Sequence, residues 1–201
     1  MIESKNKYII KEKEKYKKGF SEGLARCDKN WGKMFYPWIE KHDFKTVVDI
    51  GCGDGSFLVD SVEKLGFEKG FGLDIASVSL GITKNHSKIT YYDSDSSSIS
   101  LQDKSVDLAG SFEVLEHISY ELIDETLSEI SRVANEYFIC SIASVYSGEE
   151  VDGDNLHIIV EDQNWWEAKL SAHFESVKRY KTGYRGAAEY GFVCKINKGE
   201  K

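Results

Sequence analysis

Proline is nearly absent from this 201-residue sequence, which contains only Pro37, and the chain has no long apolar run. A membrane-spanning helix needs about 20 consecutive apolar residues, so we expect no membrane segment. The first residues lack the apolar stretch of a signal peptide. The four cysteines are scattered, without the paired spacing of a zinc site or a disulfide framework. These absences favour a globular, cytoplasmic protein with free thiols.

Positive charge is scarce beyond the first 18 residues. The net charge is −8, but residues 1–18 hold seven lysines and three glutamates, a local net of +4, which leaves −12 for the rest of the chain. Extended nucleic-acid binding requires a contiguous basic surface, so an acidic body argues against it. We interpret residues 1–18 as a basic, solvated lead-in to a single domain that spans residues 19–201.

The most informative segment is residues 47–55, where a short apolar run ends in an acid and opens into a glycine-rich loop. The β-branched residues before Asp49 indicate a buried strand. Gly51, Gly53 and Gly55 permit positive φ and let a ligand lie directly against the backbone. Apolar residues at helical spacing follow. Strand, glycine loop and helix are together typical of the nucleotide-binding turn of an open α/β sheet.

A second acid, Asp74, indicates which nucleotide binds there. It ends the next predicted strand, about twenty residues beyond the glycines, where a carboxylate can accept hydrogen bonds from both ribose hydroxyls of an adenosine. A dinucleotide-binding loop would share this acid, but it has glycine or alanine where this chain has Ser56. A pyrophosphate also has no use for Asp49. A ligand with a cationic amino-acid end fits Asp49 and Asp54 better.

These motifs resemble those of the class I S-adenosylmethionine (SAM)-dependent methyltransferases. The resemblance covers residues 46 to about 140, and it includes an adenine-contact stretch at 95–96 and a fourth strand with its following loop at 108–118. It implies SAM as the cofactor and a Rossmann-like α/β fold. The SAM-binding residues that the resemblance implies are Asp49, Gly51, Cys52, Gly53, Gly55, Asp74, Ile75, Asp95, Ser96, Phe112 and Glu113.

The remaining pattern predicts how the domain is arranged. Residues 19–44 should form a helical cap, divided near Pro37. Residues 45–201 should form the Rossmann-like core, a seven-stranded, mostly parallel sheet with helices on both faces and one antiparallel strand. Ser119 and Asp162 are candidate N-caps of two later helices.

Two histidines are candidate catalytic residues. Methyl transfer to a hydroxyl needs a base with a pKa near neutrality, which histidine provides. His157 lies in a segment that should overhang the carboxyl ends of the strands, where acceptors bind, and His117 lies in the fourth-strand motif. Asp152 and Asp154 have the spacing that a hard divalent ion could use. A lone Asp-x-Asp is more typical of a solvated loop, so we predict no metal site.

The expected acceptor is a small molecule or a saccharide, methylated at oxygen. Members of the superfamily that methylate DNA bases use proline-containing motifs, and this chain has no proline after Pro37. The residues leave open a small-amine N-methyltransferase, a SAM-binding regulatory module or pseudoenzyme, and a SAM-using enzyme that does not methylate. They do not specify an oligomeric state.

Overall fold

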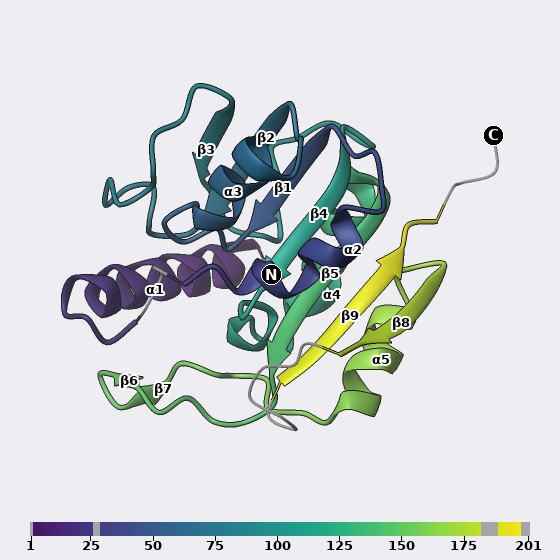
Figure 1. Cartoon of the computed structure of the whole chain (residues 1–201). Coiled ribbons are helices and arrows are strands. Elements are labelled where there is room, and N and C mark those ends of the chain that lie inside the picture. Colours follow the sequence, from purple (N-terminus) through teal and green to yellow (C-terminus); the bar gives the residue numbers. More distant parts are fainter. Residues whose placement is uncertain (1, 26–28, 182–188, 198–201) are drawn as a thin grey trace.

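Seven strands form one sheet in the order β3-β2-β1-β4-β5-β9-β8 (Figure 1). The computed structural model describes residues 2–25, 29–181 and 189–197. Strands β1 to β5 are parallel, and β9 runs antiparallel between β5 and β8. The strands are β1 (Thr46–Ile50), β2 (Lys69–Asp74), β3 (Ile89–Asp93), β4 (Val106–Phe112), β5 (Ala134–Ala143), β8 (Ser176–Tyr180) and β9 (Glu189–Lys195). The sequence-based prediction of a Rossmann-like, mostly parallel seven-stranded sheet is confirmed.

Helices cover both faces of this sheet. One face packs against α3 (Ser56–Lys64), η1 (Trp31–Phe35) and α2 (Tyr36–Ile39), and the other against α4 (Ile123–Val133) and α5 (Gln163–Ser171). Figure 1 shows α2 and α3 on the viewer's side of the sheet. Each layer encloses its own cluster of buried apolar side chains. The sheet is thereby shielded from water on both faces, as parallel sheets require.

Strand β1 illustrates how the sequence specifies this layering. Val47 points into one buried cluster, whereas Val48 and Ile50 point into the other. A strand that is buried on both faces has a continuous apolar sequence rather than an alternating one. The acid within this run, Asp49, is therefore carried into the interior at the point where the chain enters the glycine loop.

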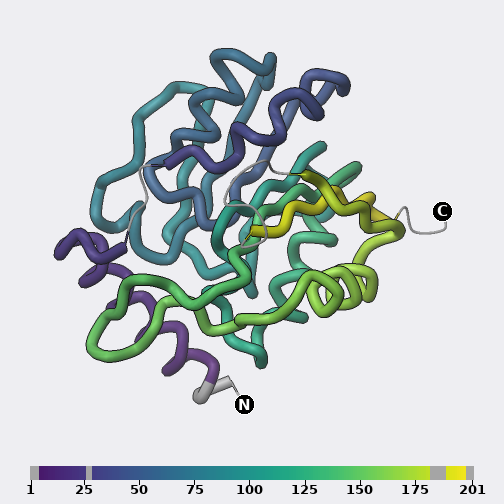
Figure 2. The backbone as a smooth tube through the Cα atoms, turned by 60° about the horizontal axis from the view of Figure 1, so that its bottom comes forward, coloured from purple at the N-terminus to yellow at the C-terminus, as the bar shows by residue number. Residues whose placement is uncertain are grey.

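Helix α1 (Ile2–Ser21) is not the solvated segment that we expected for residues 1–18. Glu12 and Lys15 are buried, and their charged groups pair at 2.5 Å. The expectation is wrong for this inner face of the helix, because long side chains on it meet the rest of the domain. Figures 1 and 2 show α1 lying beside the hairpin of β6 (Glu150–Val151) and β7 (Asp154–Asn155).

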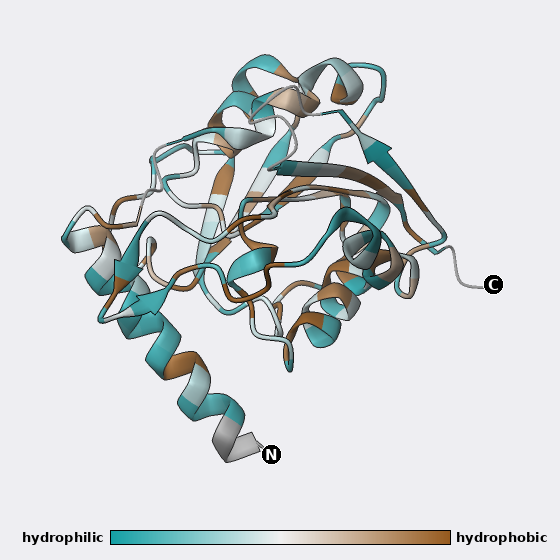
Figure 3. Ribbon diagram, turned by 90° about the horizontal axis from the view of Figure 1, so that it is seen from below, coloured by the Kyte–Doolittle hydropathy of each residue, from teal (hydrophilic) through white to brown (hydrophobic). Residues whose placement is uncertain are grey.

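The outer lysines of α1 join it to other elements. Lys11 pairs with Asp154 at 3.1 Å, and Lys18 pairs with Asp152. The two acids that could have suggested an ion site therefore face lysines instead. Further pairs join Lys13 to Asp93 at the end of β3 and Lys5 to Glu125 in α4. Figure 3 accordingly shows α1 as a largely hydrophilic ribbon at the edge of the molecule.

The short cap helices pack directly on the sheet. Pro37 lies in the first turn of α2, where its fixed φ is compatible with a helix start, so the predicted division of the cap is confirmed. Phe35 is fully buried and stacks on the ring of Tyr180 with centroids 4.6 Å apart. The Tyr180 hydroxyl also donates to the Met34 carbonyl at 3.1 Å. The cap is therefore tied to β8, the edge strand of the sheet.

The two predicted N-caps have different outcomes. The Asp162 side chain accepts a hydrogen bond from the Trp165 N–H at 2.8 Å and caps α5, as predicted. The prediction for Ser119 is wrong, because α4 begins at Ile123, with Leu122 at the N-cap and no side-chain cap. The Ser119 carbonyl accepts from the N–H groups of Leu122 and Ile123. A tight turn thus precedes the helix and delays its start.

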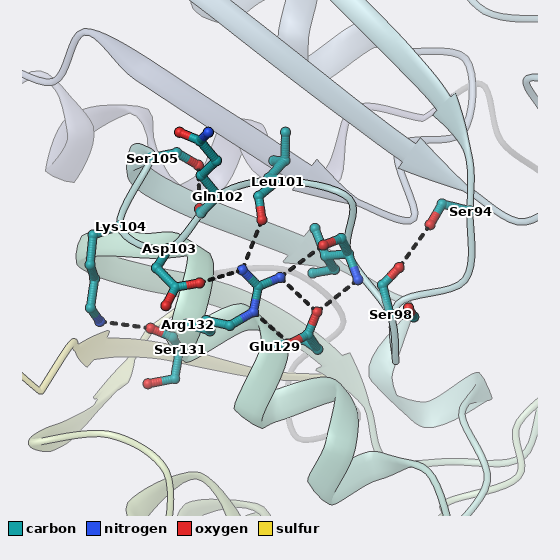
Figure 4. Close-up of polar contacts among 11 residues, drawn as sticks. Ser94, Ser98, Leu101, Gln102, Asp103, Lys104, Ser105, Glu129, Ser131 and Arg132 are labelled. Atoms are coloured by element: carbon teal, nitrogen blue, oxygen red, sulfur yellow. Dashed lines mark hydrogen bonds and ion pairs between the residues drawn. The ribbon is translucent and has the colours of Figure 1, made fainter. Parts of the chain in front are cut away.

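Arg132, in the last turn of α4, holds the long connection between β3 and β4 (Figure 4). Its guanidinium donates to the carbonyls of Ile99 and Leu101, each at 2.8 Å, and to the Asp103 carboxylate at 2.7 Å. Glu129 accepts from Arg132 and from the Ile99 N–H, and the adjacent guanidinium lowers the pKa of the Glu129 carboxyl. This network fixes the connection that carries the predicted adenine contacts.

No helix in the described ranges combines the length and the apolar character that a membrane crossing needs. Cys52, Cys140 and Cys194 are buried and unpaired, as expected of free thiols. Cys27 lies outside the described residues.

Candidate functional site

A pocket of about 550 Å³ lies at the carboxyl ends of β1, β2 and β4, the end at which open α/β sheets bind ligands. Its walls come from the glycine loop, from the connections after β2, β3 and β4, from α1, and from the loop around residues 145–157. Among the residues predicted from sequence, the pocket is lined by Asp49, Gly51, Cys52, Gly53, Asp74, Ile75, Asp95, Ser96, Phe112, Glu113, His117 and His157. Gly55 does not line it.

Two glycines of the loop after β1 have different structural roles. Gly51 has φ 73°, and its N–H donates to the Leu73 carbonyl at 2.8 Å. A Cβ there would lie 2.3 Å from a methyl carbon of Val114. Gly55 is the N-cap of α3 with φ 79°, and a Cβ there would lie 2.1 Å from the Tyr91 hydroxyl. Gly51 shapes the pocket floor, whereas Gly55 allows close packing behind it.

Asp74 is held at the end of β2 by three backbone donors. Its Oδ2 accepts from the Gly53 N–H at 3.0 Å, and its Oδ1 accepts from the N–H groups of Ala76 and Ser77 at 2.9 and 2.7 Å. The residue is buried, so these bonds fix the carboxylate and couple it to the glycine loop. Each carboxylate oxygen can accept more than one hydrogen bond, which leaves capacity for ligand hydroxyls.

Asp49 has a buried carboxylate that is only partly satisfied. The residue is 3% exposed, and its Oδ1 has no hydrogen-bond partner. Burial, followed by the negative charges of Asp74 and Asp54, raises the pKa of this carboxyl well above its ordinary value. A buried carboxylate without a partner is costly. Its position on the pocket wall therefore fits a ligand that brings a cationic group.

The connection after β3 brings Asp95 and Ser96 to the pocket. The Asp95 Oδ1 accepts from the Ser97 N–H at 2.9 Å and from the Ser97 hydroxyl. This local turn orients the Asp95 side chain, and the Arg132 network holds the residues that follow it. The connection is thus shaped before any ligand arrives.

Glu113 lies where the chain leaves β4 on the pocket wall. Its φ is 58°, and its N–H donates to the Ser141 carbonyl at 2.9 Å. A non-glycine residue in this conformation is uncommon, and such strain gathers at functional sites. The turn directs the chain into the short helix η2 (Leu115–His117).

His117 and His157 come from different parts of the chain and meet at the far end of the pocket. Their ring centroids lie 4.8 Å apart, and the rings are nearly perpendicular. Nδ1 of His117 lies 2.8 Å from the Leu156 carbonyl, and Nδ1 of His157 lies against the Val145 carbonyl. A ring nitrogen that meets a carbonyl carries the proton, so Nε2 has the lone pair in each neutral ring. Burial, followed by the charge of His157, lowers the pKa of His117 to about 3, so that ring is neutral at pH 7.

Glu116, which the sequence reasoning missed, lies next to this pair and is fully buried. Its Oε1 accepts from the Ala143 N–H at 3.0 Å, and its Oε2 has no hydrogen-bond partner. Burial, followed by the charge of Glu113, raises the pKa of its carboxyl well above the ordinary value. Its carbonyl accepts from the N–H groups of Ile158 and Ile159. The available signal was an acid inside an otherwise apolar segment.

The sequence reasoning also missed the wall that α1 supplies. Tyr8, Glu12, Tyr16 and Phe20 all line the pocket. Their spacing of four residues places them on one face of a helix, which was a usable signal in a segment otherwise dominated by lysine. The Tyr16 hydroxyl is buried without a hydrogen-bond partner, and its ring meets that of His117 edge to face at 5.8 Å. The first helix of the chain therefore closes the pocket over the histidine pair.

Comparison with known proteins gives one family match. Residues 47–136 match the family described as a methyltransferase domain. The matched segment runs from β1 to the start of β5 and includes the glycine loop, Asp74, Asp95 and Glu113. No curated protein sequence shows a significant match.

Many solved structures share the fold. The 1,6-didemethyltoxoflavin-N1-methyltransferase of Burkholderia thailandensis, solved with 1,6-didemethyltoxoflavin and S-adenosylhomocysteine, matches with a TM-score of 0.72 at 14% identity over 96% of this chain and 90% of that one. A Haloferax volcanii protein solved with the Trm112 methyltransferase activator matches at 0.69 and 16%, over 92% and 99%. A phosphoethanolamine N-methyltransferase of Haemonchus contortus matches at 0.65 and 13%, over 84% and 53%. At these identities the likeness establishes the fold.

Proposed function

We propose that this SAM-dependent methyltransferase transfers a methyl group to a hydroxyl oxygen of a small molecule or a saccharide. The observation that carries the proposal is one continuous pocket, which joins the glycine loop and Asp74 at one end to His117 and His157 at the other. Its volume of about 550 Å³ lies within the range of small-molecule sites. The pocket thus has the size of a small-molecule site and two chemically different ends.

The cofactor end fits SAM in its charge and its hydrogen-bonding groups. In this proposal the unsatisfied Asp49 carboxylate faces the cationic amino-acid end, and the loop from Gly51 to Gly53 lies against it. Asp74 accepts from the ribose hydroxyls, with Ile75 beside it. The remaining contacts would come from Asp95 and Ser96 to the adenine, and from Phe112 and Glu113 along the wall, with Cys52 in the floor and Gly55 supporting it from behind.

At the acceptor end, the protein orients the acceptor and takes up its proton. When bound, SAM supplies a methyl group already activated on a sulfonium. Correct placement of two reactants contributes up to about 7–11 kcal/mol to such a reaction, and the walls from α1 and from residues 145–157 provide that placement while limiting access of water. The Nε2 lone pairs of His117 and His157 are the groups best placed to draw the proton from an acceptor hydroxyl.

Methylation of a small amine is the second candidate. The pocket wall carries acidic side chains, among them Glu12 and Glu113, which would attract a cationic amine, and two of the structures with this fold are named as N-methyltransferases. An amine that arrives neutral needs no histidine base. A purely regulatory SAM-binding module is disfavoured because the pocket extends past the cofactor end to exposed Tyr146.

The test is to incubate the protein with methyl-labelled SAM and separate pools of sugars, nucleotide sugars, phenols, amines, RNA and protein. Label should transfer to a hydroxyl compound and remain stable to treatments that hydrolyse esters. Calorimetry should show saturable binding of SAM. Transfer confined to amines would replace the proposal by its alternative, and label in RNA or protein would contradict the small acceptor.

A further inference from the structure

Three side chains at the acceptor end form a cluster with the composition of a metal site. Glu116, His117 and His157 each offer one ligand atom, and these atoms all lie within 4.8 Å of one another. The two histidines line the pocket, whereas Glu116 lies fully buried behind them. Two imidazoles and one carboxylate are a frequent set of protein ligands for divalent ions that also bind a substrate or water.

The two rings are already oriented as metal ligands require. A metal-binding histidine almost always donates its other ring N–H to a carbonyl or a carboxylate, which fixes the tautomer and the ring orientation. Here the Leu156 carbonyl holds Nδ1 of His117 at 2.8 Å, and the Val145 carbonyl holds Nδ1 of His157. Nε2 is thus the ligand atom of both rings.

Glu116 supplies the independent second observation. Its Oε1 is occupied by the Ala143 N–H at 3.0 Å, while its Oε2 is buried without a hydrogen-bond partner. A fully buried acceptor atom that faces no donor is rare and costly. A cation between Glu116 and the two imidazoles would satisfy this oxygen.

The backbone holds the segment of His157 against that of Glu116. The Glu116 carbonyl accepts from the N–H groups of Ile158 and Ile159 at 2.7 and 2.9 Å. The Asn155 side chain accepts from the His157 N–H at 3.0 Å and bridges to Ser147 across the loop. The cluster therefore rests on fixed backbone at both of its segments, even though the two are distant in sequence.

We propose that Glu116, His117 and His157 bind one divalent first-row transition-metal ion, of the class of Zn²⁺, Mn²⁺, Fe²⁺ or Co²⁺. Imidazole ligands favour these ions over Mg²⁺ and Ca²⁺, which prefer oxygen ligands. Bonds of about 2.0–2.2 Å in a tetrahedral shell place ligand atoms about 3.3 Å apart. Small side-chain rotations therefore suffice to close the cluster around an ion.

The ion would add a function to the acceptor end, and in this respect the inference rests on the proposed methyl transfer. Three protein ligands leave at least one coordination position open toward the pocket. An acceptor hydroxyl bound there loses its proton more readily, as metal-bound water does, and the proton passes to solvent. The oxygen lone pair then forms the C–O bond while the electrons of the C–S bond stay on sulfur. His117 and His157 act as ligands in this case.

The test measures metal binding without SAM or acceptor. Protein stripped with a chelator is dialysed into metal-free buffer and titrated with Co²⁺, followed by visible absorption, and with Zn²⁺, followed by calorimetry. We expect one equivalent of each, with Zn²⁺ displacing Co²⁺. His157→Ala and Glu116→Gln should weaken binding by more than the ~10–100-fold that loss of an outer-sphere partner causes. Glu116→Gln keeps an acceptor for the Ala143 N–H, so folding is preserved.

His173→Ala is the matched control, because His173 pairs with Asp124 on the surface of α4 and should bind both ions as the wild type does. SAM affinity, measured on the same samples, separates the two proposals. Protein that binds SAM but no Co²⁺ or Zn²⁺ would overturn the metal site alone. Undiminished ion binding by both variants would also overturn it, since the ion would then lie elsewhere. Absence of SAM binding would count against the proposed function and leave the metal measurement unaffected.

Discussion

The two ends of the pocket are built by different means. At the cofactor end, contacts are mostly to backbone and connect neighbouring strands: Asp74 accepts from Gly53, Ala76 and Ser77. At the acceptor end, side chains from three distant segments meet, with Tyr16 of α1 against His117 and His117 against His157. A common cofactor can be held by a fixed backbone frame, whereas the acceptor end depends on side chains that can be exchanged without disturbing the sheet. Variants should therefore separate the two ends.

The largest effect should follow from breaking the acceptor end alone. His157→Ala removes an Nε2 lone pair that draws on the acceptor proton, directly or through an ion, so turnover should fall by about 10²–10⁴-fold. SAM affinity, measured by calorimetry, should stay unchanged, because no cofactor-end residue contacts this ring in the proposal. His173→Ala serves as the control. A loss of SAM affinity in His157→Ala would show that the two ends are not separable.

The opposite separation should follow from Asp74→Asn. The amide keeps an oxygen for Ala76 and Ser77 but presents an NH₂ group to the Gly53 N–H, and the charge that ribose hydroxyls bind is lost. A hydrogen bond to a charged group contributes about 1.5–3 kcal/mol, so the Kd for SAM should rise by about 10–150-fold. Thermal unfolding reports damage to the loop itself. Asp93→Asn, at the register-paired position of β3, should bind SAM normally; equal weakening in both variants would refute a specific role of Asp74.

The pH dependence of SAM affinity should sharpen the role of Asp49. Its pKa is raised in the free protein by burial and by Asp74 and Asp54, so a proton must leave before the carboxylate can face a cation. Affinity should therefore increase as pH rises through this pKa, by at most about tenfold per pH unit for one proton, and should level off above it. Calorimetry at several pH values, in buffers of different ionisation enthalpy, measures the released proton. In Asp49→Asn the slope should vanish; the same slope in both proteins would exclude Asp49.

The smallest effect should come from the ion pairs of α1. Lys11→Gln with Lys18→Gln removes the pairs with Asp154 and Asp152 and should speed amide hydrogen exchange in α1 while the sheet keeps its protection. High salt should reduce the difference between variant and wild type, because salt screens exposed charges. Lys17→Gln is the matched control, since Lys17 pairs with Glu14 in the same helix. Unchanged exchange in the double variant would show that the apolar face alone holds α1.

The difference between the two ends also explains what the sequence could predict. The strand order, the glycine loop and the positions of Asp49 and Asp74 follow from local patterns, because each residue type is required by backbone geometry within a few residues. The wall made by α1 and the position of Glu116 could not be predicted, since both depend on contacts between distant segments. His117, for example, bonds to a carbonyl 39 residues later. The N-cap at Ser119 failed because a tight turn competed with helix initiation.

The distant anchoring of α1 has a consequence for biosynthesis. Lys11 finds its partner 143 residues further along the chain, and Lys18 finds its partner 134 residues further along. At about 5–20 residues per second, the ribosome needs roughly 7–29 s to deliver the hairpin after the helix. Closing so long a loop also carries an entropic cost that only later contacts offset. The helix that is made first is therefore anchored last, and until then Tyr8, Tyr16 and Phe20 remain accessible to chaperones.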